Sequence, residues 1–277
     1  MFDDVEICAM NFHYSRYPIE VFLDDVVRLD IKTIELWGAA PHFYIGDNGF
    51  SEIKALKTAI DKRGLQLACF TPEQCVYPID IAARDLRLRD RSIQYFMDCI
   101  NVSAQLDSPA VLITPGFGFM NEDLQEVRAR SLDALDKIAR YAQGIGIKLY
   151  LEPLPAAYSK IIQTSQELRI ILDEIDSPAL YGMIDTACAH VTGETIADYG
   201  NNLGDRLGHI HMIDTDNSGA HLAWGDGKLP LADYLNQIKQ ASYHGAISLE
   251  IIGPRYHQDP FIPLRQSVEM LRSHSKA

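Results

Sequence analysis

Apolar and polar residues follow each other in short blocks along this chain of 277 residues. Eight apolar blocks have the length and composition of strands that are buried on both faces. We predict these strands at residues 5–10, 33–36, 65–70, 110–114, 148–152, 180–185, 207–211 and 246–250. Segments with apolar residues at helical spacing follow them in turn, and we predict helices at residues 18–29, 50–63, 84–106, 121–142, 165–175, 194–203, 231–241 and 262–273.

This alternation of strands and helices indicates the fold class. Strands too apolar to have a solvated face, each followed by a helix, are typical of a closed parallel barrel, so we predict an α/β fold of the (β/α)8 TIM barrel type. A doubly wound open sheet is the alternative, but no Gly-x-Gly-x-x-Gly sequence follows the first strand. No linker or charge block divides the chain, so we expect residues 1–277 to form one domain.

Composition narrows the range of partners. The net charge of -13 argues against nucleic-acid binding, which needs a basic face, and suits neutral or cationic small molecules. The five cysteines are scattered without a Cys-x-x-Cys pair, a pattern typical of reduced thiols in the cytoplasm. The start of the chain has no signal-peptide pattern, and no apolar stretch approaches the roughly 20 residues that cross a bilayer. We therefore expect a cytoplasmic protein without a nucleic-acid or membrane partner.

Four of the predicted strands end in a potential metal ligand. These residues are Glu152, Asp185, His211 and Glu250, at the ends of strands five to eight. The carboxyl ends of barrel strands meet at one rim, where such barrels carry their chemistry. Taken singly, a strand-end carboxylate more often caps a helix or pairs with Arg, but four at matching strand ends predict a shared site.

A cation would make such a cluster tolerable. An unpaired buried charge costs roughly several kcal/mol, and three carboxylates against a dication leave about one net negative charge. Oxygen ligands with one nitrogen favour a hard or borderline divalent ion, such as Mn²⁺, Mg²⁺ or Co²⁺. We therefore predict one divalent metal ion as cofactor.

Two glutamates that face each other across a cation indicate a reaction class. A dication that bridges a carbonyl and its neighbouring hydroxyl acidifies the C–H between them and stabilises the resulting enediolate. One of Glu152 and Glu250 can remove that proton, and the other can return a proton to the opposite face. This pair would invert the carbon, although the sequence does not indicate which glutamate acts first.

Other polar residues near predicted strand ends are candidates for substrate contact. They are His13, Trp37, Thr71, Glu73 and His190, while Arg255 and Tyr256 are loop candidates for reaching a distal part of the substrate. His209 lies one step deeper on its strand than His211 and on the same side, so we predict a hydrogen-bonded core histidine rather than a ligand. The turn Gly225-Asp-Gly227 fits loop chemistry, and such a loop can form a lid.

Several segments resemble a known family. They are Ile34-Glu-Leu-Trp-Gly38 with Pro41-His42, Phe70-Thr-Pro-Glu73 with Tyr77-Pro78, Leu151-Glu-Pro-Leu154, Met183-Ile-Asp185, His209-Ile-His-Met-Ile-Asp214 and Gly225-Asp-Gly-Lys228. Together they resemble the xylose-isomerase-like sugar epimerase superfamily, and within it the fructoselysine 3-epimerases most of all. The resemblance runs in the same order over nearly the whole chain.

This resemblance implies a (β/α)8 barrel that binds one divalent ion, often manganese. It implies that Glu152, Asp185, His211 and Glu250 are the ligands, and that Glu152 and Glu250 are the acid/base pair acting at C3 of a ketose. The implied partner is a small sugar or sugar-amine substrate, and the implied assembly is a dimer or tetramer of identical chains.

Three positions depart from the pattern of the epimerases that act on free ketoses. Cys188 stands where those enzymes carry a His, Asn217 where they carry an Arg, and Tyr158 where they carry a Glu. Those side chains hold hydroxyls around the reacting carbon, so the departures argue against activity on a free ketohexose. The fructoselysine 3-epimerases also lack the first two groups but retain the Glu that Tyr158 replaces here. The resemblance therefore implies a substituted ketose without singling out fructoselysine, and Tyr158 is a candidate substrate contact.

Other functions stay open at this point. An aldose–ketose isomerase or a keto-inositol dehydratase would use the same barrel and cation. A metal-dependent sugar-binding protein without catalysis is a further alternative, although the chain retains both acid/base carboxylates. The endonuclease that repairs abasic DNA shares this barrel, but the acidic charge and Cys188 argue against it.

Overall fold

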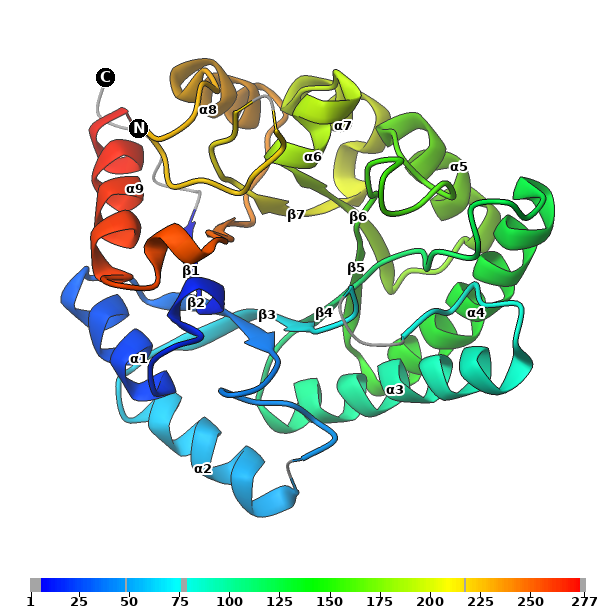
Figure 1. The fold of residues 1–277 in the computed structure, drawn as a ribbon, viewed down its shortest axis with the longest axis horizontal. Helices are drawn as coiled ribbons and strands as arrows, with labels where there is room; N and C mark the ends of the chain where they lie inside the picture. The colour runs from blue at the N-terminus through cyan, green and yellow to red at the C-terminus, as the bar shows by residue number, and fades with distance from the viewer. Residues whose placement is uncertain (1–5, 48, 76–78, 217, 275–277) are drawn as a thin grey trace.

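In the computed structural model, eight parallel strands close into a barrel in chain order, and the helices surround it (Figure 1). The structure describes residues 6–47, 49–75, 79–216 and 218–274. The strands are β1 (Glu6–Met10), β2 (Thr33–Gly38), β3 (Gln66–Pro72), β4 (Ala110–Ile113), β5 (Lys148–Leu151), β6 (Leu180–Asp185), β7 (Leu207–His211) and β8 (Ala246–Leu249). The predicted TIM barrel is therefore confirmed.

The helices follow the strands around the outside of the barrel. They are α1 (Ile19–Arg28), α2 (Phe50–Asp61), α3 (Leu86–Gln105), α4 (Leu124–Ile145), α5 (Ser165–Ile175), α6 (Thr186–Thr192), α7 (Ile196–Leu203), α8 (Leu231–Gln240) and α9 (Phe261–His274), with short 3-10 helices η1 (Phe12–Tyr14), η2 (Gly204–Arg206) and η3 (Pro254–Tyr256). Among the described helices, none has the length and apolar character that crossing a membrane requires.

Two helix predictions differ from the structure. We predicted a single helix at residues 194–203 after β6, but α6 precedes it and ends at Gly193, whose backbone is left-handed. We also predicted that the helix from residue 121 ends at residue 142, before Gly144 and Gly146. It begins instead after the Asp123 cap and continues through Gly144, and it ends where Gly146 adopts the left-handed conformation.

Side chains along each strand point alternately outward to the helices and inward to the barrel, and they form two separate cores. Outward-facing residues such as Val111, Leu149 and Ile184 pack against the helices, because successive side chains of a strand point to opposite faces. The inward-facing residues Cys69, Ala110, Leu112, Tyr150 and Met183 form a smaller cluster inside the barrel. The next inward positions toward the carboxyl ends of the strands are therefore available for the site.

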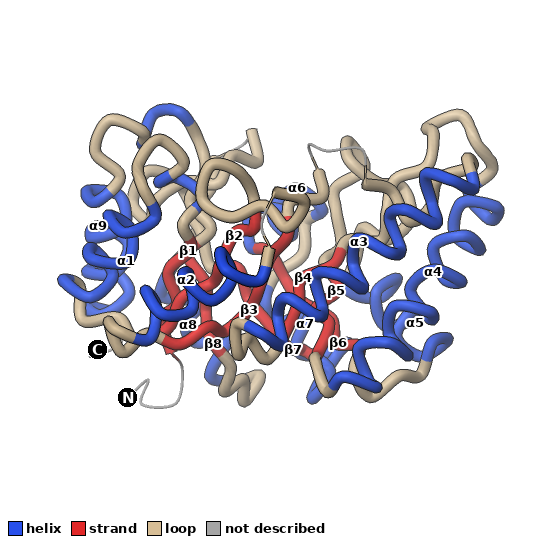
Figure 2. The backbone as a smooth tube through the Cα atoms, turned by 90° about the horizontal axis from the view of Figure 1, so that it is seen from below, coloured by secondary structure: helices blue, strands red, loops and turns tan. Residues whose placement is uncertain are grey.

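The carboxyl ends of the strands form one edge of the barrel. Figure 2 shows long loops above this edge, opposite the edge where the strands begin. We predicted that β5 and β8 end at Glu152 and Glu250, but the regular strands end one residue earlier, at Leu151 and Leu249. Both glutamates therefore stand just beyond the ladder, at the floor of the space that the loops enclose.

Candidate metal centre and active site

The barrel brings Glu152, Asp185, His211 and Glu250 together. One ligand atom of each lies within 4.8 Å of those of the other three, and all four residues are buried. Asp185 and His211 are paired in the register of β6 and β7, which aligns their side chains on the inner face. The closure of the barrel places Glu152 and Glu250 on either side of them.

Two buried atoms in this cluster lack a hydrogen-bond partner. Asp185 Oδ1 accepts a hydrogen bond of 2.7 Å from the Cys188 amide, but Asp185 Oδ2 and His211 Nδ1 have no such partner among the described residues. His211 Nδ1 lies 3.7 Å from Asp185 Oδ2 and 3.1 Å from Glu250 Oε2. Because unpartnered buried polar groups are costly, these converging atoms fit a bound cation, and three oxygens with one nitrogen suit a hard or borderline divalent ion.

The two glutamates differ in charge state without a cation. Burial raises the pKa of Glu152 to about 8, and the neighbouring Glu250 and Asp185 carboxylates add to this effect while His211 opposes it. Burial also acts on Glu250, but the charge of His211 and the contacts with His211 and His221 outweigh it and lower the pKa to about 2. The surroundings of the two carboxyl groups therefore shift their pKa values in opposite directions.

Glu35 is a buried partner of His211 to which the sequence argument assigned no role. It lies on β2, across the barrel, and its Oε1 is 3.0 Å from His211 Nε2. The charges of Glu35 and Glu250 raise the pKa of His211 well above its usual value, against the opposing effect of burial. In turn, the two nearby histidines hold the pKa of Glu35 well below its usual value, although burial opposes them. The sequence did contain a signal, because Glu35 and Trp37 are two positions apart and both face inward.

His209 lies one position deeper than His211, as predicted. Its Nε2 is 2.8 Å from Glu35 Oε2, and its ring stacks on that of Tyr150 at 5.2 Å between centroids. His209 is therefore buried and hydrogen-bonded, and its exclusion from the ligands stays a prediction.

His221 also joins the cluster and was missed by the sequence argument. Its Nδ1 is 3.0 Å from Glu250 Oε2 and 3.9 Å from Asp185 Oδ2. The Asp185 and Glu250 carboxylates raise its pKa to about 9, although burial opposes them. It lies in the loop after β7, where no periodic pattern indicates the direction of a side chain.

That loop is held by the carboxylate of Asp214. Asp214 is buried and accepts hydrogen bonds from the backbone amides of Thr215, Gly225, Gly227 and Leu229 at 2.9–3.0 Å. Tyr256 donates a 2.7 Å hydrogen bond to Asp226 of the same loop and is itself buried. Tyr256 thus supports the loop, and Arg255 lies 3.9 Å from Asp226 at the surface.

A cavity of about 610 Å³ opens above the cluster. Glu152, Glu250, Cys188 and His221 line it on the side of β5 to β8, and apolar residues including Phe12, Leu112, Leu154, Val191 and Ile252 line much of the rest. Its volume is within the range of small-molecule sites, and a few convergent polar groups in an apolar wall are typical of them.

Of the six residues predicted to contact substrate, four line the cavity and two do not. Trp37, Thr71, Glu73 and Tyr158 line the cavity, with the indole of Trp37 donating a 3.1 Å hydrogen bond to Glu73. Tyr158 is 61% exposed, so it stands at the mouth. His13 is fully buried in η1, and His190 is exposed on α6; neither is among the residues that line the cavity. Asn217 and the Tyr77-Pro78 segment lie outside the described residues.

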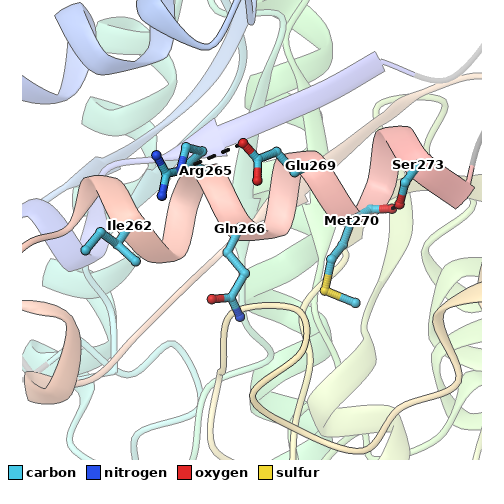
Figure 3. Close-up of a pocket in the computed structure, with 6 residues that line it drawn as sticks. All are labelled: Ile262, Arg265, Gln266, Glu269, Met270 and Ser273. Atoms are coloured by element: carbon cyan, nitrogen blue, oxygen red, sulfur yellow. Dashed lines mark hydrogen bonds and ion pairs between the residues drawn. The ribbon is translucent and has the colours of Figure 1, made fainter.

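A second hollow, of about 410 Å³, lies at the surface of α9 (Figure 3). Its six lining residues come from this one helix, and its polar side chains include the Arg265–Glu269 ion pair at 3.8 Å. It lies outside the barrel mouth and contains none of the clustered potential metal ligands. The mouth of the barrel is therefore the candidate active site.

Comparison with known proteins identifies a family with this barrel fold. The family model described as xylose isomerase-like TIM barrel matches residues 23–274. The fructoselysine 3-epimerase of Shigella flexneri is 28% identical over 261 residues, which cover 94% of each chain. A D-psicose 3-epimerase of Enterocloster bolteae is 30% identical over 131 residues, which cover 47% of this chain and 42% of that protein.

Solved structures support the fold. A structure of L-ribulose 3-epimerase superposes with a TM-score of 0.82 at 17% identity, covering 98% of this chain and 96% of the other. A 3-keto-D-glucoside 4-epimerase from E. coli superposes with a TM-score of 0.80 at 20% identity, covering 97% and 99%. The match of the family model to nearly the whole chain decides the relationship. This chain belongs to the xylose isomerase-like TIM barrel family.

Proposed function

We propose that the protein is a divalent-cation-dependent sugar epimerase that inverts C3 of a ketose or ketose derivative. The observation that carries this proposal is the convergence of Glu152, Asp185, His211 and Glu250, of which Glu152 and Glu250 line a cavity of about 610 Å³. Two relatives support the same reaction: a fructoselysine 3-epimerase that aligns with 94% of this chain and a D-psicose 3-epimerase that aligns with 47% of it.

The four clustered residues would hold the cation. Their three carboxylates and one imidazole favour Mn²⁺, with Mg²⁺ or Co²⁺ as alternatives. When bound, such a cation supplies Lewis acidity toward the carbonyl and hydroxyl oxygens that flank the reacting carbon.

Glu152 and Glu250 are the proposed acid/base pair. They directly follow β5 and β8, with β6 and β7 between them, so their carboxyl groups approach the cavity from two sides. One carboxylate removes the proton from C3, and the other carboxyl group delivers a proton to the opposite face, which inverts the carbon. Each positioned group of this kind typically contributes about 10²–10⁴-fold to the rate.

The cavity supports a substituted ketose as substrate. Cys188 and Tyr158 line it at two positions where the resemblance to free-ketose epimerases would place a His and a Glu. An extensive apolar wall leaves room for a substituent beyond the sugar, so a fructoselysine-like sugar-amine is the substrate class that we propose.

The five cysteines are free, which supports a cytoplasmic enzyme. We also propose that the enzyme is a dimer or tetramer of identical chains.

The deciding experiment is a screen of ketoses and glycated amino acids with Mn²⁺ in D₂O. We expect cation-dependent uptake of one deuterium at C3 and a product of inverted configuration without loss of water. Loss of water would instead indicate a dehydratase, and formation of an aldose an isomerase. Binding of the sugar without any exchange would contradict catalysis and indicate a sugar-binding protein.

A further inference from the structure

The carboxylate of Glu35 links two histidines inside the barrel. Glu35 is fully buried on β2, whereas both histidines lie on β7. Its Oε2 is 2.8 Å from His209 Nε2, and its Oε1 is 3.0 Å from His211 Nε2. The hydroxyl of Thr71 also donates a hydrogen bond to Oε1. The Glu35 carboxylate is thus enclosed by three side-chain donors.

These contacts determine how His211 is presented to the cluster. A carboxylate can only accept hydrogen bonds, so the His211 nitrogen that faces Glu35 must carry a hydrogen. The other nitrogen, Nδ1, faces Asp185 and Glu250 and has no hydrogen-bond partner among the described residues. A histidine ligand needs a free electron pair toward the cation, and its outer nitrogen commonly donates to a carboxylate that fixes this tautomer.

We propose that Glu35 is a positioning residue that presents Nδ1 of His211 to the cation and strengthens cation binding, while His209 and Thr71 hold Glu35 in place. Glu35 does not line the cavity, so it acts through His211 and not on the sugar. The inference rests on the cation site of the proposed function, but it does not depend on which sugar reaction follows.

A different role for the same residues must be separated from this one. Ligand atoms of Glu35, His209 and His211 also lie close enough together to hold a cation themselves. The hydrogen-bond lengths and the third donor, Thr71, favour the positioning role, because they already engage both oxygens of the carboxylate. The two roles predict different numbers of bound cations.

In the test, the purified protein is titrated with Mn²⁺ alone, without sugar, and calorimetry measures the affinity and the number of cations bound per chain. We expect one Mn²⁺ per chain in the unmodified protein. Glu35→Gln should weaken binding about 10–100-fold with the same stoichiometry, the range typical for outer partners of histidine ligands. Thr71→Val removes one donor to Glu35 but leaves both imidazole contacts, so it should weaken Mn²⁺ binding less than Glu35→Gln does.

A matched control separates cation binding from stability. Ser131→Ala also deletes a buried hydrogen bond, to the Pro115 carbonyl, but Ser131 lies on α4 outside the barrel. It should lower stability without changing Mn²⁺ affinity. Unchanged affinity in Glu35→Gln would overturn the proposal, as would equal weakening in Ser131→Ala. Two Mn²⁺ per chain that fall to one in Glu35→Gln would also overturn it, in favour of a second cation site.

The tautomer of His211 supplies a readout that does not need a variant. With Mg²⁺ bound, ¹⁵N NMR of histidine-labelled protein should show a hydrogen on Nε2 of His211 and none on Nδ1. The reverse pattern would overturn the proposal even if Glu35→Gln fails to fold. If these results hold but no ketose undergoes exchange, the epimerase proposal alone fails.

Discussion

Asp185 uses its two carboxylate oxygens for different tasks. Oδ1 caps α6 by accepting the hydrogen bond from the Cys188 amide, and Oδ2 faces His211 with no hydrogen-bond partner in the described part of the chain. From the sequence we expected such a residue either to cap a helix or to bind a cation. The geometry is compatible with both, because a carboxylate has enough electron pairs for both contacts.

The acid/base pair can be tested at the level of single atoms. Glu152→Gln and Glu250→Gln each keep the size of the side chain but remove its ability to carry a proton. Each variant should therefore lose proton exchange at C3, with a rate at least about 10²-fold below that of the unmodified protein. Deuterium uptake by the substrate in D₂O measures this loss. Glu174→Gln, at an exposed ion pair with Arg128, is the matched control and should exchange normally. Turnover retained in either active-site variant would refute the role assigned to that glutamate.

His13 should make the fold sensitive to acid. Its burial lowers its pKa to about 3, whereas an unfolded histidine titrates near 6.5. Between these values the unfolded chain binds a proton that the folded chain does not, so stability is full above about pH 6.5 and falls as the pH falls toward 3. We expect a loss of about 2 kcal/mol between pH 7 and pH 5 from this residue.

Urea unfolding at both pH values measures this contribution. His13→Gln, which stays neutral throughout, should show a smaller decrease in the free energy of unfolding than the unmodified protein. An identical decrease in both proteins would show that His13 does not cause the acid sensitivity.

At the scale of elements, the end of α4 was misplaced by the sequence argument. Glycines usually mark helix ends, but here only Gly146 has a left-handed backbone, while Gly144 is helical and a Cβ there would meet nothing within 4 Å. Gly144→Ala should therefore stabilise the protein by about 0.5 kcal/mol, and Gly146→Ala should destabilise it by about 1 kcal/mol. Urea unfolding measures the change in the free energy of unfolding in each variant, and changes of the same sign in both variants would contradict the prediction.

The loop between β7 and α8 depends on the absence of a side chain at Gly227. A Cβ at this position would collide with the Asp214 carboxylate and the Thr215 carbonyl, both of which organise the loop. Gly227→Ala should cost about 1–3 kcal/mol, the usual range for overpacking, and should open the loop that carries His221. Limited proteolysis between residues 214 and 229 would detect this opening. Gly144→Ala is the control, and an unchanged cleavage rate in Gly227→Ala would contradict the prediction.

The strands were predictable because their signal is local. Apolar runs of the right length located every strand, and the position of Glu152, Asp185, His211 and Glu250 at the ends of neighbouring strands indicated a common rim. In contrast, α6 is a short helix that starts from the Asp185 cap, and it has too few residues for a periodic pattern.

The remainder of the site was harder to predict because it depends on contacts between distant segments. Glu35 meets His209 and His211 only through closure of the barrel, and His221 reaches Glu250 only because a loop is folded over the rim. In η1 and α6, several residues beyond the strand ends, the alternation of the strands no longer predicts the direction of a side chain. His13 therefore turns into the interior at η1, and His190 turns outward on α6, although both follow strand ends.

For the whole molecule, cation binding should contribute measurably to stability. A cation at 100 times its dissociation constant stabilises the folded state by about 2.7 kcal/mol, so Mn²⁺ should raise the melting temperature by several degrees relative to protein treated with EDTA. Differential scanning calorimetry measures the shift. Asp185→Ala should lose most of it, and an equal shift in that variant would place the stabilising cation elsewhere.

The wide separation of Glu35 and β7 along the chain has a consequence for synthesis on the ribosome. Glu35 meets its histidine partners only 174 and 176 residues later, after about three quarters of the chain has been made. Until then its carboxylate cannot be enclosed without a large energetic cost, because an unpaired charge is poorly tolerated away from water. We therefore expect the growing chain to leave this side chain in contact with solvent, or protonated, until β7 has been made.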